Sequence, residues 1–393
     1  MKRLNLIFLG EFAYPQGMAG TKLIQHAIDG IRHDPDVSIR VIILRQSSKV
    51  NVLNGCHEGI RYETVMGDLL RSRMALLFPL FYLKARRALN RAFRSDYDNI
   101  IYNYGPPNMF NVGILAYAQR LGYKIVFDIV EDYDTAMDIS SSLSHRVQMT
   151  GINYMSRRVK HLASGIIVIS SHLQKKYEDL LEGEVPLHYR PISVDFDRYP
   201  SNSACFSDPL TLFYSGTFGK KDGVHVLLEA FDALAVKHET IRLILTGKGT
   251  REAMQPVFSQ IKASPYKDRI EYKGYLDDDA YYAALNVADI PCMTRINIDY
   301  AQAGFPFKLG EFLATGKPVI ASRVSDIECM LENRREAMLV EPGDSNEIVA
   351  AVEYLIAHPG NATDIGRRGR MKARTLFDYR KQGQLLLKFL RSL

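Results

Sequence analysis

The sequence is poor in cysteine and contains no internal repeat and no long apolar segment. Its four cysteines, Cys56, Cys205, Cys292 and Cys329, are far apart. No Cys-x-x-Cys or Cys/His spacing occurs, so neither a structural zinc site nor a disulfide framework is indicated. The longest charge-free apolar runs fall well short of the roughly 18 residues that a membrane-spanning helix needs. The lack of repeats and low-complexity tracts rules out solenoid, collagen-like and disordered chains.

The composition is that of a globular protein with more than one domain. Hydrophobic residues make up 47% and charged residues 24% of the 393 residues, which predicts a soluble chain of two or three domains. Residues 1–10 resemble a signal peptide, but the apolar run is too short and an acidic residue follows it, so we expect a buried strand instead. Together with the cysteine usage, this favours a reducing cytoplasm.

Short apolar segments alternate with amphipathic helical stretches along the whole chain. Fully apolar segments such as GIIVIS (165–170) and PVIAS (318–322) need cover on both faces, which predicts parallel sheets in β-α-β units. The expected strands of the first half are residues 4–10, 39–44, 60–65, 99–103, 124–127 and 165–169. Those of the second half are residues 210–215, 241–246, 269–273, 288–293, 318–322 and 337–340.

Two such runs predict an α/β protein with two Rossmann-like domains. Residues 190–209 are rich in Pro, Ser, Asp and Asn and have no periodicity, so the boundary is expected there. We therefore predict an N-terminal domain at 1–195 and a C-terminal domain at 205–375. The last segment, 376–393, is expected to form an amphipathic helix that returns to the first domain. Ligands of open parallel sheets bind at the carboxyl ends of the strands.

The segment AGFPFKLGEFLATGKPVIAS (303–322) carries the most specific signal. Pro306 suits the first position of a helix, because its fixed φ costs nothing there. The backbone N–H groups of Phe307, Lys308 and Leu309 would then point at an anion. The Lys308 ammonium adds a positive charge beside them. This pattern predicts a phosphate site at a helix N-terminus.

The same helix carries an acceptor for hydroxyl groups. Glu311 follows Lys308 by three residues, so the two share nearly the same helix face. A carboxylate at this place can accept both hydroxyls of a ribose. Gly316 is expected to end the helix. The alternative is an ordinary, well-capped helix, which we consider weaker because phosphate donors and a hydroxyl acceptor converge at one terminus.

These residues resemble the C-terminal signature of the retaining glycosyltransferases of family 4, which have the GT-B fold. Three further segments, 213–231, 243–254 and 270–293, are similar to the phosphate loop, the next glycine turn and the nucleobase-facing turn of the donor domain in that family. The resemblance implies a nucleoside diphosphate-sugar donor in the C-terminal domain and a hydroxyl acceptor on the N-terminal domain.

The sequence also departs from the family pattern. The usual motif is Glu-x7-Glu; its second Glu falls on Glu311, but its first falls on Ala303. The first Glu usually contacts the donor sugar, so the identity of the sugar is not carried over.

The phosphate loop departs as well. Its usual Arg and Lys fall on Thr217 and Asp222, and Lys220 and Lys221 lie close by in the sequence. A diphosphate leaving group left unneutralised in a dry cleft is expensive. We therefore expect Lys220 and Lys221 to take over the charge together with Lys308. A solvated turn is an equally good interpretation of Lys220 and Lys221.

Glycine turns supply further candidates for donor binding. Gly216 lies between a strand and a helix, where a Cβ would block the approach of a phosphate. Gly17 and Gly20 resemble the glycine loop of the N-terminal domain, although a plain tight turn competes. Gly274 and Tyr275 are candidates for contact with the nucleobase, and Tyr275 could equally be a filler side chain. Neither GxGxxG nor GxxxxGK[ST] occurs, which argues against a dinucleotide dehydrogenase and a P-loop NTPase.

An acidic segment in the first half provides candidate catalytic groups. FDIVEDYD (127–134) follows a predicted strand at its carboxyl end. Asp128 or Glu131 could orient or deprotonate an acceptor hydroxyl; an acidic loop that caps the next helix is the alternative for each. No His-rich metal motif is apparent, and the basic phosphate site would replace a divalent metal, so no metal or other cofactor is expected.

Residues 69–95 contain seven Arg and Lys residues and no acidic residue. Large apolar side chains accompany them: Phe78, Phe81, Tyr82, Leu83 and Phe93. This pattern favours contact with an anionic membrane surface. A core helix with a solvated basic face is the alternative, and nucleic acid is not indicated because no binding module accompanies the charge.

The predicted function is the transfer of a sugar from a nucleoside diphosphate donor to a hydroxyl acceptor with retention of configuration. The resemblance implies a role in polysaccharide or glycolipid assembly, in the cytoplasm or at the inner face of the membrane, with an acceptor that could be lipid-linked. Two alternatives stay open. One is a non-catalytic GT-B subunit that binds a partner enzyme, suggested by Ala303, Thr217 and Asp222. The other is a GT-B epimerase that acts on a UDP-sugar.

Overall fold

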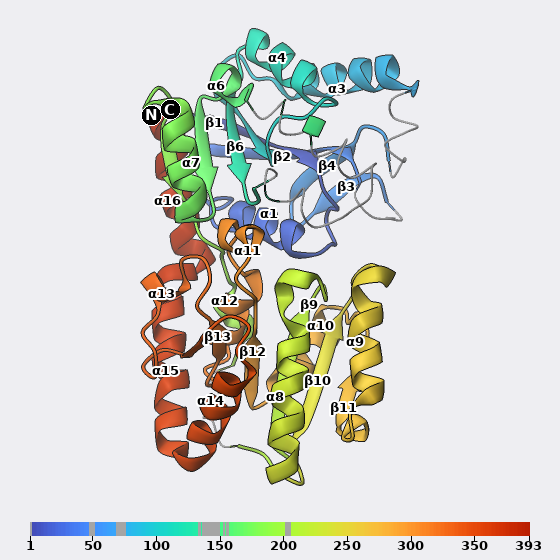
Figure 1. Ribbon diagram of the computed structural model, residues 1–393. Coiled ribbons are helices and arrows are strands. Elements are labelled where there is room, and N and C mark those ends of the chain that lie inside the picture. The colour runs from blue at the N-terminus through green and yellow to red at the C-terminus, as the bar shows by residue number, and fades with distance from the viewer. Residues whose placement is uncertain are drawn as a thin grey trace. The chain divides into compact units, whose positions relative to one another are not determined.

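The chain folds into two compact α/β units (Figure 1). The computed structural model describes residues 2–46, 52–67, 76–132, 135, 150–151, 154, 157–200 and 206–393. The first unit comprises Met1–Pro191 together with Tyr379–Leu393, and the second comprises Ile192–Asp378. The chain thus first leaves unit 1 within the expected boundary segment, 190–209. It returns to unit 1 at Tyr379, three residues after the start of the segment 376–393 that was predicted to return there.

The sheet of the first unit has eight strands in the order β3-β4-β2-β1-β5-β6-β7-β8. Its pairs are parallel except for the antiparallel pair β3–β4. Six of these strands lie where the apolar pattern predicts them; β3 and β8 were not predicted, because both are short and neither is fully buried. The strands are β1 (Leu4–Glu11), β2 (Val37–Arg45), β3 (Asn54–His57), β4 (Ile60–Thr64), β5 (Asp98–Tyr104), β6 (Lys124–Ile129), β7 (Gly165–Val168) and β8 (Leu187–Tyr189).

Helices cover both faces of this sheet, as its buried strands require. Leu6 and Phe8 of β1 pack in one core cluster with residues of α1 and α16. Asn5 points to the opposite face, where its amide donates to the carbonyl of Ala92 in α3 at 2.8 Å. The helices are α1 (Ala19–Asp29), α3 (Phe78–Ala92), α4 (Val112–Leu121), α6 (Val159–Leu162), α7 (Ser171–Leu181) and α16 (Tyr379–Ser392).

The C-terminal helix α16 belongs to the first unit because it crosses α1 at a glycine pair. A Cβ on Gly383 would lie 2.4 Å from the Cα of Gly30 and 2.5 Å from its carbonyl oxygen. Beside the crossing, the rings of His26 and Tyr379 stack with centroids 5.7 Å apart. The two backbones therefore touch without intervening side chains.

The second unit has a six-stranded sheet in the order β11-β10-β9-β12-β13-β14, in which all strand pairs are parallel. All six strands lie at their predicted places, with ends that differ by up to two residues. They are β9 (Thr211–Gly216), β10 (Arg242–Gly247), β11 (Ile270–Tyr272), β12 (Ile290–Met293), β13 (Ile320–Ser322) and β14 (Met338–Val340). Both units therefore have the predicted Rossmann-like character.

Side chains of the central strand β9 alternate between two helix layers. Leu212 and Tyr214 lie in one core cluster with residues of α8 and α14. Phe213 faces the other way, where its ring lies 6.2 Å from that of Tyr281 in α10 and 6.0 Å from that of Phe312 in α12. The helices are α8 (Val224–Lys237), α9 (Arg251–Ala263), α10 (Asp278–Val287), α11 (Asp299–Ala303), α12 (Phe307–Ala314), α13 (Ile327–Met330), α14 (Ser345–Ala357) and α15 (Pro359–Phe377).

The glycine crossing makes a testable prediction about stability. Gly383→Ala places a methyl group against the backbone of Gly30, so we expect a loss of about 1–3 kcal/mol in the free energy of unfolding. Gly360→Ala is the matched control, because nothing lies within 4 Å of a Cβ at this position in α15. The control should be neutral or more stable by up to about 1 kcal/mol. Urea denaturation of both variants measures the difference; equal midpoints would contradict the crossing.

Candidate functional site

The second unit has a topological switch point at β9. The chain continues from β9 to β10 on one side, whereas β12 flanks β9 on the other. At such a point the loops after the two central strands diverge and leave a crevice for a ligand at the strands' carboxyl ends. The loops after β9 and β12 meet here: the N–H of Ile296 donates to the carbonyl of Lys221 at 3.0 Å. Gly223 permits this contact, because a Cβ on it would lie 1.8 Å from the carbonyl oxygen of Thr294.

A hydrogen bond between Thr217 and Asp222 holds the loop after β9. These are the two positions at which the family pattern has basic residues. Asp222 is buried, and its Oδ2 accepts from the Thr217 hydroxyl at 2.7 Å and from the backbone N–H of Gly219 at 2.9 Å. Thr217 and Asp222 are thus partners of each other. Where the family pattern has two basic residues, this loop has a hydrogen bond between a neutral and an acidic side chain of its own.

Lys220 and Lys221 form a short 3-10 turn with Asp222 next to this bond. Lys220 is exposed. Lys221 is half-buried, and its Nζ lies 4.1 Å from the centre of the Tyr300 ring in α11. The structure brings both lysines to the switch point, and their contact with a phosphate stays a prediction.

Helix α12 begins one residue later than the sequence predicts. Pro306 is its N-cap, and Phe307 is its first residue. The N–H of Leu309 donates to the carbonyl of Pro306 at 3.1 Å. The predicted role of Leu309 as a donor to phosphate is therefore corrected: its N–H closes the first turn, and its side chain is buried. Phe307 and Lys308 remain candidates. Gly316 follows the helix with φ +78°, as the sequence predicts.

Lys308 and Glu311 are in direct contact. The Lys308 Nζ lies 2.9 Å from Glu311 Oε2, and the Tyr281 hydroxyl donates to the same oxygen at 2.8 Å. The Lys308 ammonium also lies 3.8 Å from the centre of the Tyr281 ring. The Glu311 side chain is 3% exposed and that of Lys308 29%, so the carboxylate is buried beneath a partly accessible cation.

Two neighbouring observations define the chemistry of this cluster. Burial, and then the charge of Glu311, raise the pKa of the Tyr281 hydroxyl well above its usual value, so Tyr281 remains a neutral donor. Ala303, at the position of the family's first Glu, is fully buried at the end of α11. The cluster therefore combines one cation, one carboxylate and one phenol, and a second carboxylate is missing at that position.

The predicted nucleobase turn is only partly available to a ligand. Gly274 has φ +69°, and its carbonyl accepts from the N–H of Gly247 at 2.8 Å and from the Thr246 hydroxyl at 2.7 Å. Both lone pairs of this carbonyl are used within the unit, so only other groups of the turn could face a base, and contact of Gly274 with the nucleobase stays a prediction. Tyr275 is 52% exposed, and Lys248, which the sequence analysis missed, places its Nζ 4.3 Å from the ring centre.

The glycines singled out by the sequence each make room for a hydroxyl group of their own unit. A Cβ on Gly216 would lie 2.1 Å from the Tyr214 hydroxyl. A Cβ on Gly17 would lie 2.1 Å from the hydroxyl of Thr21, and one on Gly20 would lie 2.6 Å from that of Tyr104. These contacts explain the glycines by packing alone, and their approach to phosphate stays a prediction.

Asp128 does not have the environment of an acceptor-binding base. It is 1% exposed, its carboxylate accepts from the Tyr102 hydroxyl, and Arg190 Nη2 lies 3.5 Å away. Burial raises the pKa of the Asp128 carboxyl, and Arg190 and Tyr102 offset part of this. The catalytic prediction for Asp128 is therefore corrected: it lies among core side chains of the first sheet, because the predicted strand continues through it to Ile129.

Glu131 follows β6 and is half-buried. Its charge contributes, after burial, to the raised pKa of Tyr104, whose hydroxyl adjoins Gly20. Glu131, Tyr104 and Gly20 therefore lie in one neighbourhood, and Glu131 remains the candidate base. Of the remaining acidic residues of this segment, Asp132 forms an ion pair with Lys176 of α7, with Oδ1 and Nζ 2.6 Å apart. Residues 133–134 lie outside the described part of the chain.

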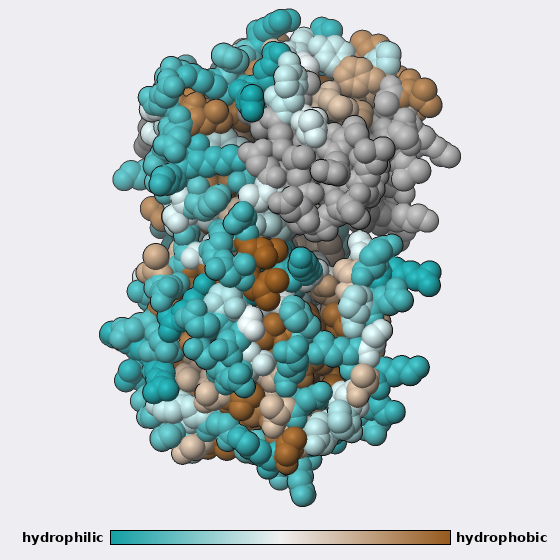
Figure 2. All heavy atoms as spheres, viewed as in Figure 1, coloured by the Kyte–Doolittle hydropathy of each residue, from teal (hydrophilic) through white to brown (hydrophobic). Residues whose placement is uncertain are grey.

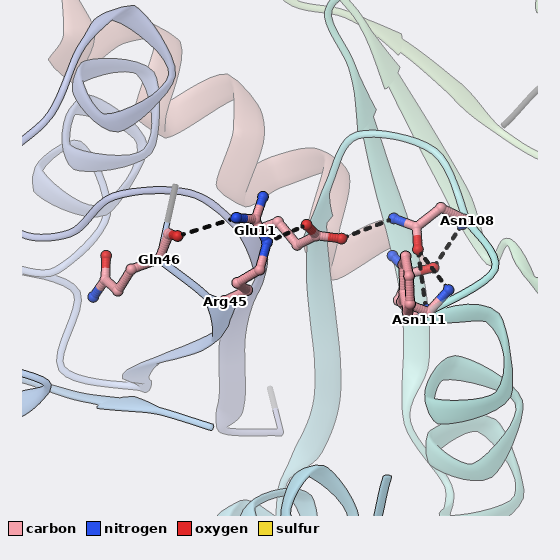
Figure 3. Close-up of polar contacts among 6 residues, drawn as sticks. Glu11, Arg45, Gln46, Asn108 and Asn111 are labelled. Carbon is pink, nitrogen blue, oxygen red and sulfur yellow. Dashed lines mark hydrogen bonds and ion pairs between the residues drawn. The ribbon is translucent and has the colours of Figure 1, made fainter. Parts of the chain in front are cut away.

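The first unit also has a switch point, at β1, with a polar network that the sequence analysis missed (Figure 3). A register shift between Gly10 and Glu11 aligns Glu11 with Arg45 at the end of β2; such a bulge changes the direction of a side chain. Glu11 Oε2 accepts from Arg45 Nε at 2.9 Å, and Oε1 accepts from the Asn108 amide at 3.4 Å. The sequence signal was available, since Glu11 directly follows the first apolar strand.

No candidate metal centre is present in the described ranges, in which no group of three or more His, Cys, Asp or Glu side chains could hold a metal ion. Nor does any described helix have the length and apolar character to cross a membrane.

Comparisons with known proteins agree with this architecture. Residues 209–358 match the family model described as Glycosyl transferases group 1. The chain is 23% identical over 307 residues to MMP alpha-(1->4)-mannosyltransferase from Mycolicibacterium hassiacum, covering 76% of this chain and 71% of that protein. It is 26% identical over 147 residues to phosphatidyl-myo-inositol mannosyltransferase from Mycobacterium leprae, covering 37% of each.

Two solved structures resemble nearly the whole chain. Sucrose-phosphate synthase from Thermosynechococcus elongatus superposes with a TM-score of 0.78 at 14% identity, covering 99% of this chain and 98% of the other. Anabaena HepE in complex with UDP-glucose superposes with a TM-score of 0.72 at 18% identity, covering 99% and 100%. The fold is therefore GT-B. The family match of residues 209–358 and the relatives named above identify the chain as a glycosyltransferase enzyme.

The closed phosphate loop makes a second prediction. Asp222→Ala removes the acceptor of the Thr217 hydroxyl and the Gly219 N–H, so the free energy of unfolding should fall by about 1–2 kcal/mol. Lys220→Ala, at an exposed position of the same turn, should stay within about 0.5 kcal/mol of the parent. Urea unfolding followed by circular dichroism compares the two, and equal stability of both variants would show that the carboxylate does not hold the loop.

Proposed function

We propose that this glycosyltransferase moves a sugar from a nucleoside diphosphate-sugar, bound by the second unit, to a hydroxyl acceptor with retention of configuration. The observation that carries the proposal is the pair Lys308–Glu311 in the N-terminal half of α12, with Nζ and Oε2 2.9 Å apart. Its cation suits a diphosphate and its carboxylate suits ribose hydroxyls. The relatives' names, which include two mannosyltransferases, and the HepE complex with UDP-glucose support the same class of donor.

The proposed chemistry follows from charge. As the bond between the anomeric carbon and the phosphate oxygen breaks, its electron pair passes to the diphosphate. The Lys308 ammonium and the N-terminal turn of α12 stabilise that charge, with Lys220 and Lys221 as further cations. The acceptor oxygen bonds to the anomeric carbon on the face that the leaving group vacates. Its proton passes to a base, for which Glu131 is the candidate. Neither a metal ion nor another cofactor takes part.

The third prediction tests donor binding. With EDTA present, UDP or GDP should raise the melting temperature, since a ligand at a hundred times its Kd adds about 2.7 kcal/mol. Lys308→Ala should weaken binding of the diphosphate more than binding of the nucleoside, by roughly 1.5–3 kcal/mol. Lys372→Ala, at an exposed position on α15, is the control. Equal losses for UDP and uridine, or for GDP and guanosine, would show that Lys308 does not contact phosphate.

Product analysis separates the proposal from its alternatives. A retaining transferase yields a glycoside with the anomeric configuration of the donor. An epimerase yields a second sugar without any acceptor. A non-catalytic subunit gives no product, and failure of every nucleotide to raise the melting temperature would favour that interpretation.

We also propose that the acceptor is lipid-linked and that α3 contacts an anionic membrane at its cytoplasmic face. Leu76, Leu80 and Leu83 are 84%, 45% and 49% exposed, and Figure 2 shows apolar residues on the surface where Figure 1 places this helix. Lys84 and Arg87, also exposed, continue the same face. A stripe that is apolar at one end and basic at the other suits a headgroup layer.

Several residues first assigned to this surface have other partners. Arg86 lies over the Tyr117 ring at 4.1 Å, and Arg91 pairs with Glu63 at 2.7 Å. Phe81 is fully buried, and Phe93 packs against Tyr123. Phe81 and Phe93 are therefore corrected from membrane contacts to packing contacts. The Arg91 side chain is 59% exposed in its ion pair and Arg86 is half-buried, so their contact with a membrane stays a prediction. Residues 69–75 of the predicted segment lie outside the described part of the chain.

The fourth prediction concerns this surface. Lys84→Glu with Arg87→Glu should weaken binding to vesicles containing phosphatidylglycerol about 30-fold or more, since each basic residue contributes about 1 kcal/mol. Leu80→Ser with Leu83→Ser should also weaken it. Leu385→Ser, at a half-exposed position on α16, should not. Sedimentation with vesicles measures the binding of all three variants. A parent protein that does not bind anionic vesicles at low salt would contradict membrane contact.

A further inference from the structure

Tyr281 touches both members of the Lys308–Glu311 pair with different parts of its side chain. Its hydroxyl donates to Glu311 Oε2 at 2.8 Å, and its ring face lies 3.8 Å below the Lys308 ammonium. The ring supplies a cation–π contact and the hydroxyl supplies a hydrogen bond to a charged acceptor. The three groups therefore form a closed triangle, because Lys308 and Glu311 also contact each other.

Tyr281 is itself held in place by elements outside the triangle. It is 4% exposed, and its ring packs against Phe213 of the central strand β9. The N-terminal turn of α10 is capped by the Asp277 side chain, which accepts from the N–H of Ala280 at 2.9 Å. At the other end of α10, the buried Lys317 ammonium donates to the carbonyl of Leu285 at 3.3 Å. Tyr281 therefore connects the two charged residues to the sheet through a fixed helix.

The Tyr281 hydroxyl is protonated at neutral pH, so it is available as the donor to Glu311. Burial and the adjacent Glu311 charge raise the pKa of its hydroxyl well above the ordinary value. The hydroxyl therefore keeps its proton at neutral pH and can donate to the carboxylate. A carboxylate that accepts one bond from a fixed donor loses rotational freedom about its last torsion, so it meets an incoming hydroxyl in one orientation.

We propose that Tyr281 is a positioning residue for the donor: its hydroxyl orients the Glu311 carboxylate toward the ribose, and its ring sets the position of the Lys308 ammonium. The proposal rests on the function proposed above. It assigns to α10 a role in ribose recognition, in addition to the role of α12. Tyr281 acts through Glu311 and Lys308 and need not touch the substrate itself.

The test uses a substitution that removes only the hydroxyl. Tyr281→Phe keeps the ring against Phe213 and under Lys308. Tyr282→Phe is the matched control, on the next residue of α10, whose ring packs against Tyr199 with centroids 5.3 Å apart. Calorimetry on the full chain then measures the Kd of UDP and GDP and of their 2′,3′-dideoxy forms, which lack the hydroxyls that Glu311 would bind.

The expected result is selective. Tyr281→Phe should weaken binding of the ribonucleotide about tenfold and that of the dideoxy form less than twofold, whereas Tyr282→Phe changes neither. In a Glu311→Gln background, Tyr281→Phe should add little, because both changes act on one contact. Circular dichroism confirms that each variant is folded.

Two results would overturn the proposal. Equal weakening of ribonucleotide and dideoxynucleotide would show that Tyr281 only supports the packing of α10. Unchanged binding of both would show that the hydroxyl has no part in donor recognition. A parent protein that binds no nucleotide is a separate outcome: it overturns the proposed function before any variant is compared, and this proposal with it.

Discussion

The carboxylate of Glu311 is buried in α12, one turn after the start of the helix, and a buried carboxylate is stable only when it is paired and hydrogen-bonded. Lys308 and Tyr281 meet this requirement at 2.9 and 2.8 Å. Three elements of the second unit supply the contact and its support. Helix α12 provides Lys308 and Glu311, α10 provides Tyr281, and β9 supports the ring through Phe213. Because each element depends on its neighbours, the pair has a defined place at the carboxyl ends of the strands, where a parallel sheet binds its ligands.

The distribution of positive charge distinguishes this chain from the family pattern that its sequence resembles. Thr217 and Asp222 hydrogen-bond to each other and hold the loop after β9. Positive charge at the switch point instead comes from Lys308 and from the lysine pair beside the loop. Lys308 contacts both Glu311 and Tyr281, so its ammonium has a defined position beside the carboxylate.

Apolar patterning was sufficient to predict both sheets, because buried parallel strands are continuous runs of β-branched residues. It missed β3 and β8, whose residues are polar or half-buried. Lys308 and Glu311 were predicted as neighbours because three residues of helix separate them. Tyr281 was not predicted to join them, since 30 positions separate it from Glu311 and only the packing of α10 on β9 brings it there. Asp128 was misassigned because a carboxylate near a strand end looks the same in sequence whether it faces a ligand or the core.

The central claim is that Lys308 and Glu311 receive the phosphate and the ribose of one nucleotide. A crystal structure of the protein soaked with UDP or GDP tests it most directly. The account predicts a phosphate oxygen within hydrogen-bond distance of the Lys308 ammonium and a ribose hydroxyl on the Glu311 carboxylate, with the Tyr281 hydroxyl still bound to that carboxylate. A nucleotide bound elsewhere, or one that leaves the Lys308–Glu311 pair without contact to either group, would contradict it.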